Sequence, residues 1–146
     1  MKYLPLVLLA LIAAGCSSPP PSASQPSPAS SPAGPLANGR SIFLTGRDAN
    51  GVRIVAATPP LLPSCAACHG ANGAGGVHFP GGEVSADLRH KALVTDMKPP
   101  YTLALVERAV ATGIDSAGER LDPVMPHWRL VGRDLHDVAS YVMTLK

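Results

Sequence analysis

Two cysteines, Cys65 and Cys68, are separated by two alanines, and His69 follows the second cysteine directly. At this spacing the two thiols lie one helical turn apart, which matches the distance between the two vinyl groups of a porphyrin. Each thiol can add across one vinyl group to form a thioether bond, and the adjacent imidazole can then bind the iron as the proximal ligand. The motif therefore predicts covalent attachment of one haem c through Cys65 and Cys68, with His69 as an iron ligand.

Two other kinds of site share the spacing of these cysteines. A redox dithiol of the thioredoxin type needs a βαβ context and no histidine at this position. A zinc site needs a second pair of ligands, and no third cysteine lies near. The haem interpretation is therefore the preferred one.

The composition of the chain limits its partners. The 146 residues suffice for one domain after processing. The formal net charge is +2 and 15% of the residues are charged, so the strong basic footprint of a nucleic-acid-binding protein is missing. Aromatic residues make up 4% of the chain, and we expect a buried porphyrin to supply much of the apolar centre.

The first 15 residues are predicted to be an export signal. Lys2 is followed by an apolar run over residues 3–14, which is too short to span a bilayer.

The small residues before Cys16 resemble a bacterial lipobox, although Ala13 stands where leucine is usual. This resemblance implies cleavage before Cys16 and acylation of its thiol; ordinary secretory cleavage with a free thiol is the alternative. Thioether attachment of haem takes place outside the cytoplasm in such bacterial proteins. We therefore expect a lipid-anchored protein on the periplasmic side of a membrane.

Residues 17–35 contain only Ser, Pro, Ala, Gln and Gly, and seven of these 19 residues are proline. Such a segment has no apolar surface to bury and is expected to be disordered. Its prolines make it extended, with a reach of up to roughly 60 Å. We divide the chain into an export signal over 1–15, lipidated Cys16 with a tether over 16–37, and a folded domain over 38–146.

Apolar periodicity predicts a helix at each end of the folded domain. Asn38 is expected to cap a short helix that ends near Gly46. An amphipathic helix should cover residues 133–145, with Gly132 as its N-cap. The inward residues of this last helix recur at three- and four-residue spacing: Leu135, Val138, Ala139, Val142 and Leu145.

A third helix is expected between these two. Thr102 should cap it, residues 103–112 should form it, and Gly113 should close it. Its inner stripe would be Leu103, Val106 and Val110, whereas Glu107 and Arg108 are expected to face water.

Residues 44–64 form an insertion before the haem motif. Asp48 and Gly51 bound a predicted turn, with Val52 and Ile54 in a short strand of a hairpin. A plain loop is the preferred interpretation of this insertion; covering a haem edge or contacting a partner are the alternatives.

Over the whole folded domain the chain resembles the class I c-type cytochromes. In that family the N- and C-terminal helices cross, and a glycine of the first helix allows an aromatic residue of the last to approach closely. Gly39, Phe43, Val138 and Tyr141 stand at the matching positions. The resemblance implies an all-α fold with three or four helices around one covalently bound haem.

The resemblance also implies a second iron ligand. The family carries a distal methionine shortly before the last helix, often followed by proline, and Met125 precedes Pro126 at that place. Met97 lies in a loop before Pro99, and Met143 falls in the last helix, where it is expected to belong to the core. Met125 is therefore expected to bind iron opposite His69.

In the same family a backbone carbonyl accepts the ring proton of the proximal histidine. Ala86 stands where that segment usually carries proline, and Pro80 is the other candidate. His78 and His127 are expected to face solvent, and a role of His78 as the second axial ligand is the alternative. Trp128 is expected to pack beside the haem or one of its propionates.

These features together imply a single-electron carrier that is not itself an enzyme. With both axial positions of the iron filled, no site would remain for a small-molecule substrate. The expected partners are a dehydrogenase, an oxidase or another cytochrome. Two alternatives stay open: a haem subunit of a larger oxidoreductase complex, and a sensor or peroxidase with five-coordinate haem.

Overall fold

The computed structural model describes residues 34–57 and 62–146. Over these residues the fold is all-α, as predicted, and extended segments meet only in isolated bridges. The helices, in chain order, are α1 (Pro35–Thr45), α2 (Cys65–His69), the π-helical turn η1 (Lys91–Asp96), α3 (Leu103–Thr112) and α4 (Gly132–Val142). None of the described helices is long and apolar enough to cross a membrane. The export signal, Cys16 and the tether up to residue 33 lie outside the described residues.

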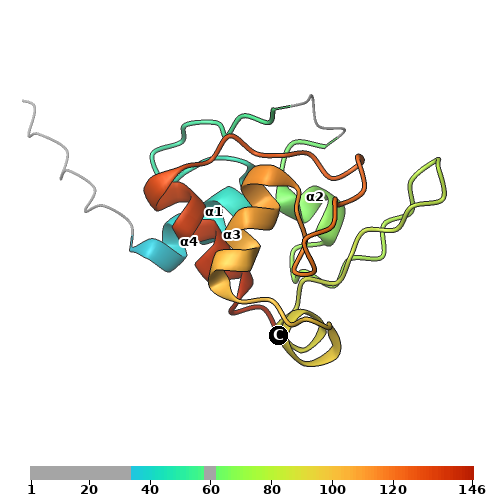
Figure 1. The fold of residues 1–146 in the computed structure, drawn as a ribbon. Helices are drawn as coiled ribbons and strands as arrows, with labels where there is room; N and C mark the ends of the chain where they lie inside the picture. Colours follow the sequence, from blue (N-terminus) through green and yellow to red (C-terminus); the bar gives the residue numbers. More distant parts are fainter. Residues whose placement is uncertain (1–33, 58–61) are drawn as a thin grey trace, which may run out of the picture.

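The first and last helices cross in direct contact, as the resemblance implied (Figure 1). Gly39 of α1 lies against the backbone carbonyl of Asp137 and the Cβ of Tyr141, so any side chain at this position would collide with α4. Beside this crossing the rings of Phe43 and Tyr141 pack with centroids 5.4 Å apart. Val138 is fully buried at the same crossing.

α1 begins earlier than the sequence suggested. Its N-cap is Gly34 and its first residue is Pro35, whose fixed φ angle suits the first turn of a helix. Residues 35–37 therefore belong to the helix rather than to the tether. The helix ends at Gly46 as predicted, with this glycine in the left-handed conformation.

Asn38 is not the helix cap that the sequence suggested, because tertiary partners take its side chain. Its Nδ2 donates to the carboxylates of Asp134 and Asp137, both at 2.9 Å. Its Oδ1 accepts a hydrogen bond from the amide of Ala49 at 2.8 Å. Asp137 is 1% exposed, so Asn38 supplies a hydrogen bond that this buried carboxylate requires. The buried amide thereby joins α1, α4 and the turn after α1.

α3 has the predicted bounds and caps. The hydroxyl of Thr102 accepts from the amide of Leu105 at 3.3 Å, and Gly113 ends the helix in the left-handed conformation. The prediction that both charged residues of α3 face water is wrong. The Nε of Arg108 is buried, and its guanidinium donates to the carbonyl of Asp115, which ties the following loop to the helix. Glu107 is half-buried and pairs with His136 at 2.9 Å.

α4 begins at Gly132, which is its first residue rather than its N-cap. It ends at Val142, so the predicted helix over 133–145 is three residues too long. Leu145 is nevertheless 7% exposed, because the chain continues along the core in a turn. The remaining predicted inward residues are buried or half-buried: Leu135, Val138, Ala139 and Val142.

The insertion lies against the segment that precedes α4. Its predicted turn is present, closed by the amide of Asp48 on the carbonyl of Val52 at 2.9 Å. Beyond the turn, residues 53–57 pass residues 127–131. Ala56 pairs with Trp128 in an isolated antiparallel bridge, and Arg53 pairs in the same way with Arg47. We call these two paired segments the ribbon. In Figure 1 they run across the top of the molecule, above α3 and α4.

Candidate haem-binding site

The haem motif forms α2, a single helical turn. Ser64 caps it, and its side chain accepts from the amide of Ala67 at 3.3 Å. The cap defines the start of the turn at Cys65, which places Cys68 one turn later and His69 at the end. Ser64 was not among the predicted functional residues, although serine is among the commonest residues at an N-cap.

The described residues enclose an apolar cavity of about 250 Å³ onto which Cys65, Cys68 and His69 open. α3 contributes one wall of the cavity and α4 another, and Leu93 of η1 also lines it. Both candidate methionines, Met97 and Met125, line this cavity. The apolar side chains that α3 and α4 contribute are short: Val106, Ala109, Val110, Val138 and Val142.

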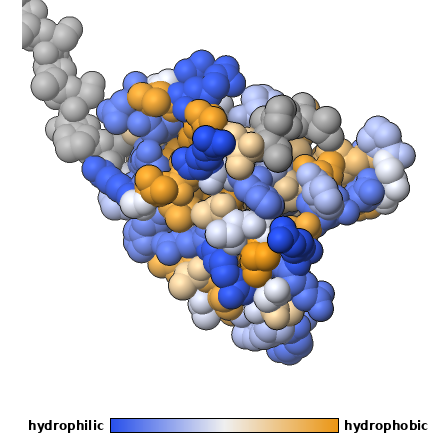
Figure 2. Space-filling model, turned by 45° about the horizontal axis from the view of Figure 1, so that its top comes forward, coloured by the Kyte–Doolittle hydropathy of each residue, from blue (hydrophilic) through white to orange (hydrophobic). Residues whose placement is uncertain are grey.

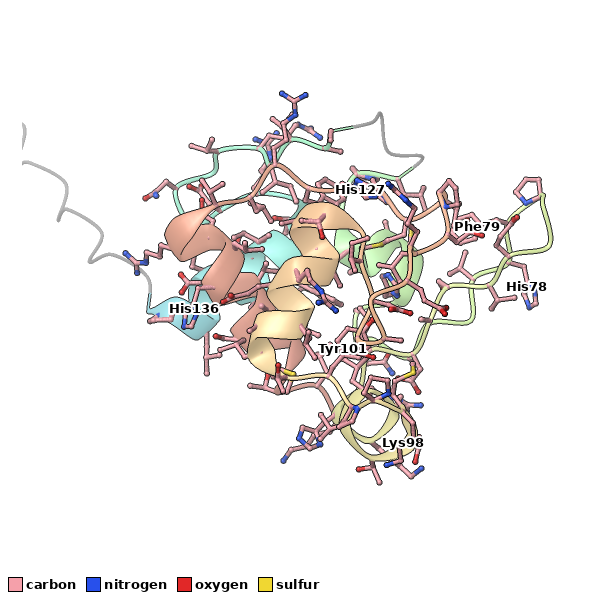
Figure 3. All side chains as sticks on the ribbon, viewed as in Figure 1. His78, Phe79, Lys98, Tyr101, His127 and His136 are labelled. Carbon is pink, nitrogen blue, oxygen red and sulfur yellow. The ribbon has the colours of Figure 1, made fainter. Side chains whose placement is uncertain are left out.

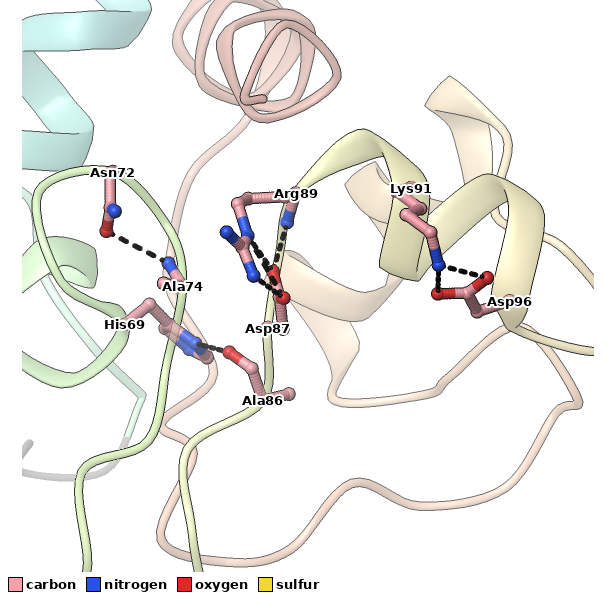
Figure 4. A network of polar contacts seen from close by, with 8 residues as sticks. All are labelled: His69, Asn72, Ala74, Ala86, Asp87, Arg89, Lys91 and Asp96. Carbon is pink, nitrogen blue, oxygen red and sulfur yellow. Dashed lines mark hydrogen bonds and ion pairs between the residues drawn. The ribbon is translucent and has the colours of Figure 1, made fainter.

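The ring of His69 is oriented by a backbone carbonyl. Its Nδ1 lies 2.8 Å from the carbonyl oxygen of Ala86, so Nδ1 carries the proton and donates it (Figure 4). Nε2 is then free of a proton and available to a metal. Ala86 is therefore the acceptor, and Pro80 is not. Burial lowers the pKa of His69, against the opposing effect of this hydrogen bond, and so favours the neutral imidazole that binds iron.

The segment that carries this carbonyl is held on both sides. Ser85 donates from its hydroxyl to the carbonyl of Cys68 at 2.7 Å and accepts from the amide of Val77 at 2.9 Å. On the other side, Arg89 forms a 2.6 Å ion pair with Asp87 and lowers the pKa of that carboxyl (Figure 4). These contacts hold the acceptor of the His69 proton in place.

The glycine-rich loop after α2 passes directly beneath this carbonyl. Gly75 has a φ angle of 66°, in the left-handed region, and a Cβ there would overlap the carbonyl oxygens of Ser85 and Ala86. Glycine is therefore required at this position for two reasons, its backbone conformation and the close approach.

The environment of the cysteines does not resemble that of a redox dithiol. Burial raises the pKa of Cys65 to about 12 and also raises the pKa of Cys68. Reactive dithiols instead have a lowered thiol pKa, because the thiolate is the attacking species. The site suits thiols that are consumed in thioether bonds.

Comparison with known families agrees with this geometry. The sequence model of the family described as Cytochrome c matches residues 48–146, which is more than half of the chain. The chain belongs to the cytochrome c family. No curated protein and no solved structure matches it. As a cytochrome c it binds haem c covalently through the motif from Cys65 to His69, and it is an electron-transfer protein.

The residues around the cavity fit haem c. In this cytochrome the two thiols and a neutral, oriented imidazole face one cavity whose walls are mainly apolar. An apolar enclosure suits the porphyrin faces and limits the access of water to the iron. Among the described residues no group of three or more His, Cys, Asp and Glu side chains is placed to hold a metal ion.

Other predicted residues lie in different places. His78 is exposed on the hairpin of residues 76–85 and points away from the cavity, as expected (Figure 3). His127 was expected to be exposed but is half-buried, because its ring packs against Gly113 at the end of α3. Trp128 is 3% exposed and lines a smaller cavity beside Cys65 and His69.

Proposed function

We propose that this cytochrome c carries single electrons with His69 and Met125 as its two axial ligands. We further propose that a lipidated Cys16 anchors it to a bacterial membrane on the periplasmic side. Its partners would be redox proteins such as a dehydrogenase, an oxidase or another cytochrome. The observation that carries the axial assignment is that His69 and Met125 open on the same apolar cavity as the two cysteines.

The chemistry that bound haem supplies is the gain and loss of one electron at its iron. The chain determines how easily that happens. The Ala86 carbonyl holds the His69 ring in one orientation and makes the imidazole more electron-rich. A thioether sulfur at the other axial position favours ferrous iron and raises the reduction potential relative to two histidines.

Two observations favour Met125 over Met97 as the distal ligand. Met125 lines both of the cavities that reach His69, whereas Met97 lines only the larger one. Met97 is also 41% exposed, whereas Met125 is half-buried. The loop before Met125 is ordered by Asp122, whose carbonyl accepts from the Met125 amide at 2.9 Å.

Substitution of each methionine tests this assignment. Met125→Ala should remove the weak far-red absorption of an iron–sulfur bond and lower the reduction potential, because the soft ligand is lost. The iron should then become high-spin or bind water or an added ligand. Met97→Ala is the matched control and should leave the oxidised spectrum unchanged.

The opposite pattern would refute the assignment. Loss of the far-red band in Met97→Ala with its retention in Met125→Ala would make Met97 the ligand. A wild-type protein that is five-coordinate at rest would instead favour the sensor or peroxidase alternative. Co-purification of a stable partner from mildly solubilised membranes would assign the chain to a larger oxidoreductase complex.

A further inference from the structure

The ribbon has an outward face that plays no part in the haem site. Side chains alternate between the two faces of an antiparallel pair. The inward side chains are buried: Ile54, Trp128 and Leu130. Most of the outward side chains are exposed: Arg53, Val55, Ala57, Arg129 and Val131. His127, at the end of the ribbon, is half-buried against Gly113. Extending the register from the Ala56–Trp128 pair places each valine opposite an arginine, so apolar and cationic side chains alternate.

This outward face is unusually apolar for exposed surface. Val55 and Val131 are 57% and 80% exposed, and neighbouring Val52 is 63% exposed. These are three of the six large hydrophobic residues that are exposed in the described part of the chain. Figure 2, which brings the top of Figure 1 forward, shows hydrophobic and hydrophilic residues interspersed here. We call the ribbon residues Arg53, Val55, Arg129 and Val131, together with Val52 of the adjoining turn, the valine–arginine face.

The charges of this face are directed outward. Neither Arg53 nor Arg129 forms an ion pair with any residue that the structure describes. The two acidic residues nearest in sequence have hydrogen-bond partners of their own. Asp48 accepts from the amide of Val52 at 2.7 Å, and Asp134 accepts from Asn38. The face therefore presents positive charge between apolar side chains.

We propose that the valine–arginine face lies against an anionic lipid surface. The guanidinium groups of Arg53 and Arg129 contact lipid phosphates, which arginine binds with two parallel hydrogen bonds. The valines enter the apolar boundary beneath the headgroups, where their burial adds to the electrostatic attraction. This gives the insertion of residues 44–64 a role in orienting the domain on a membrane.

Two other occupants fit the face less well. A second copy of the chain would bring the same arginines together, and like charges across an interface are costly. The central contacts of a protein partner are typically aromatic residues and arginine in fully buried pockets, and this face carries no aromatic side chain. A flat surface of lipid phosphates needs neither a pocket nor an aromatic anchor.

The path of the chain also favours a lipid surface, in an argument that rests on the proposed anchor at Cys16. Asn38, in the first turn of α1, bonds to Ala49, four residues before Arg53. The first turn of α1 therefore contacts the turn that leads into the valine–arginine face. A tether of roughly 60 Å keeps the face at a high effective concentration near the membrane, so a weak lipid contact suffices.

Chemical modification of arginine tests the contact directly. The mature holoprotein is reconstituted into vesicles rich in phosphatidylglycerol or made of phosphatidylcholine alone, and phenylglyoxal adducts are located by mass spectrometry. Arg53 and Arg129 should react at least about five-fold more slowly on the anionic vesicles, since one basic side chain at such a surface contributes about five-fold in affinity. Exposed Arg120 lies outside the face and serves as the internal control. High salt should remove the difference.

Paired variants separate the charge of this face from charge elsewhere on the protein. Arg53→Gln with Arg129→Gln should weaken docking about thirty-fold, measured as the loss of vesicle-dependent protection of amide hydrogens in residues 52–57 and 127–131. Lys98→Gln with Arg120→Gln removes equal charge elsewhere and should keep this protection. Unchanged haem spectra would show that each variant is folded.

Three results would overturn the proposal. Equal reaction of Arg53 and Arg129 on both kinds of vesicle would exclude a lipid contact. Protection that rises with protein density on neutral vesicles would indicate contact between copies. Protection found in native membranes but not on pure lipid would indicate an acidic protein partner. The mass of the N-terminal peptide in the same samples reports lipidation of Cys16, so failure of the anchor is recognised separately.

Discussion

The Ala86 carbonyl is the residue-scale feature on which the proximal ligand depends. The carbonyl oxygen lies 2.8 Å from His69 Nδ1 and accepts the only N–H proton of the neutral ring. Nε2 is therefore the nitrogen that remains for iron. The carbonyl is placed by Ser85, by the Asp87–Arg89 pair and by the close passage of Gly75. Because the acceptor is a backbone oxygen, the side chain at position 86 matters less for this hydrogen bond than the path of the backbone.

A methyl group at Gly75 should disturb this carbonyl. We expect Gly75→Ala to displace the Ala86 oxygen and weaken its hydrogen bond with His69, which makes the imidazole a weaker donor and raises the reduction potential. The left-handed backbone should add a stability cost of about 1 kcal/mol or more. Redox titration and denaturant unfolding of the holoprotein measure the two effects.

Gly76 provides a matched control for this change. Its φ angle of 84° is also left-handed, but nothing lies within 4 Å of a Cβ built there. Gly76→Ala should therefore carry the backbone cost and leave the potential unchanged. Equal shifts of potential in both variants would contradict the role given to the Ala86 carbonyl.

At the scale of elements, the crossing of α1 and α4 holds the fold closed around the cavity. Gly39 permits backbone contact at the crossing, and the Phe43–Tyr141 pair packs beside it. Asn38 adds buried hydrogen bonds to two carboxylates of α4. α4 in turn supplies Val138 and Val142 to the cavity wall, so the crossing and the site share residues.

A single methyl group at the crossing should be severely destabilising. We expect Gly39→Ala to lower the free energy of unfolding by about 3 kcal/mol, because its Cβ would overlap backbone atoms of Asp137 that cannot move without shifting α4. Denaturant unfolding of the holoprotein measures this. Gly34→Ala, at the open N-cap of α1, should cost less than about 1 kcal/mol. A Gly39→Ala protein as stable as the control would show that the helices separate easily.

At the scale of the whole molecule, the haem domain follows the segment that carries the proposed anchor. α1 begins at Pro35, and the residues before Gly34 carry the proposed anchor. No residue of the valine–arginine face lines the haem cavity. A cytochrome held on a membrane by such a face would keep a constant orientation toward its redox partners.

The proposed anchor predicts the covalent form of the mature chain. We expect mass spectrometry to show a mature protein that starts at acylated Cys16 and carries one haem that survives denaturation and acid–acetone extraction. Cys16→Ser should block the acylation and the cleavage that follows it, and leave the haem content unchanged. An unmodified Cys16 or an N-terminus elsewhere would refute the lipoprotein assignment, and complete extraction of the haem would contradict the thioether bonds.

The sequence by itself determined the features whose causes are local. The spacing of Cys65, Cys68 and His69 is a property of five residues, and it predicted the cofactor. Thr102 and Gly113 bound α3 through their own side-chain and backbone preferences, so its limits were predicted correctly. The helix crossing followed from resemblance to a family, and the structure confirmed it.

Only the tertiary structure decided the features that depend on distant partners. Asn38 is suited to capping a helix, but carboxylates almost 100 residues away in the sequence take its amide. Arg108 was expected in water, yet the loop at Asp115 covers it. The ribbon pairs segments about 70 residues apart. The preference of a residue for a local structure is weak compared with a buried hydrogen bond. No short stretch of sequence reveals the partner in such a bond.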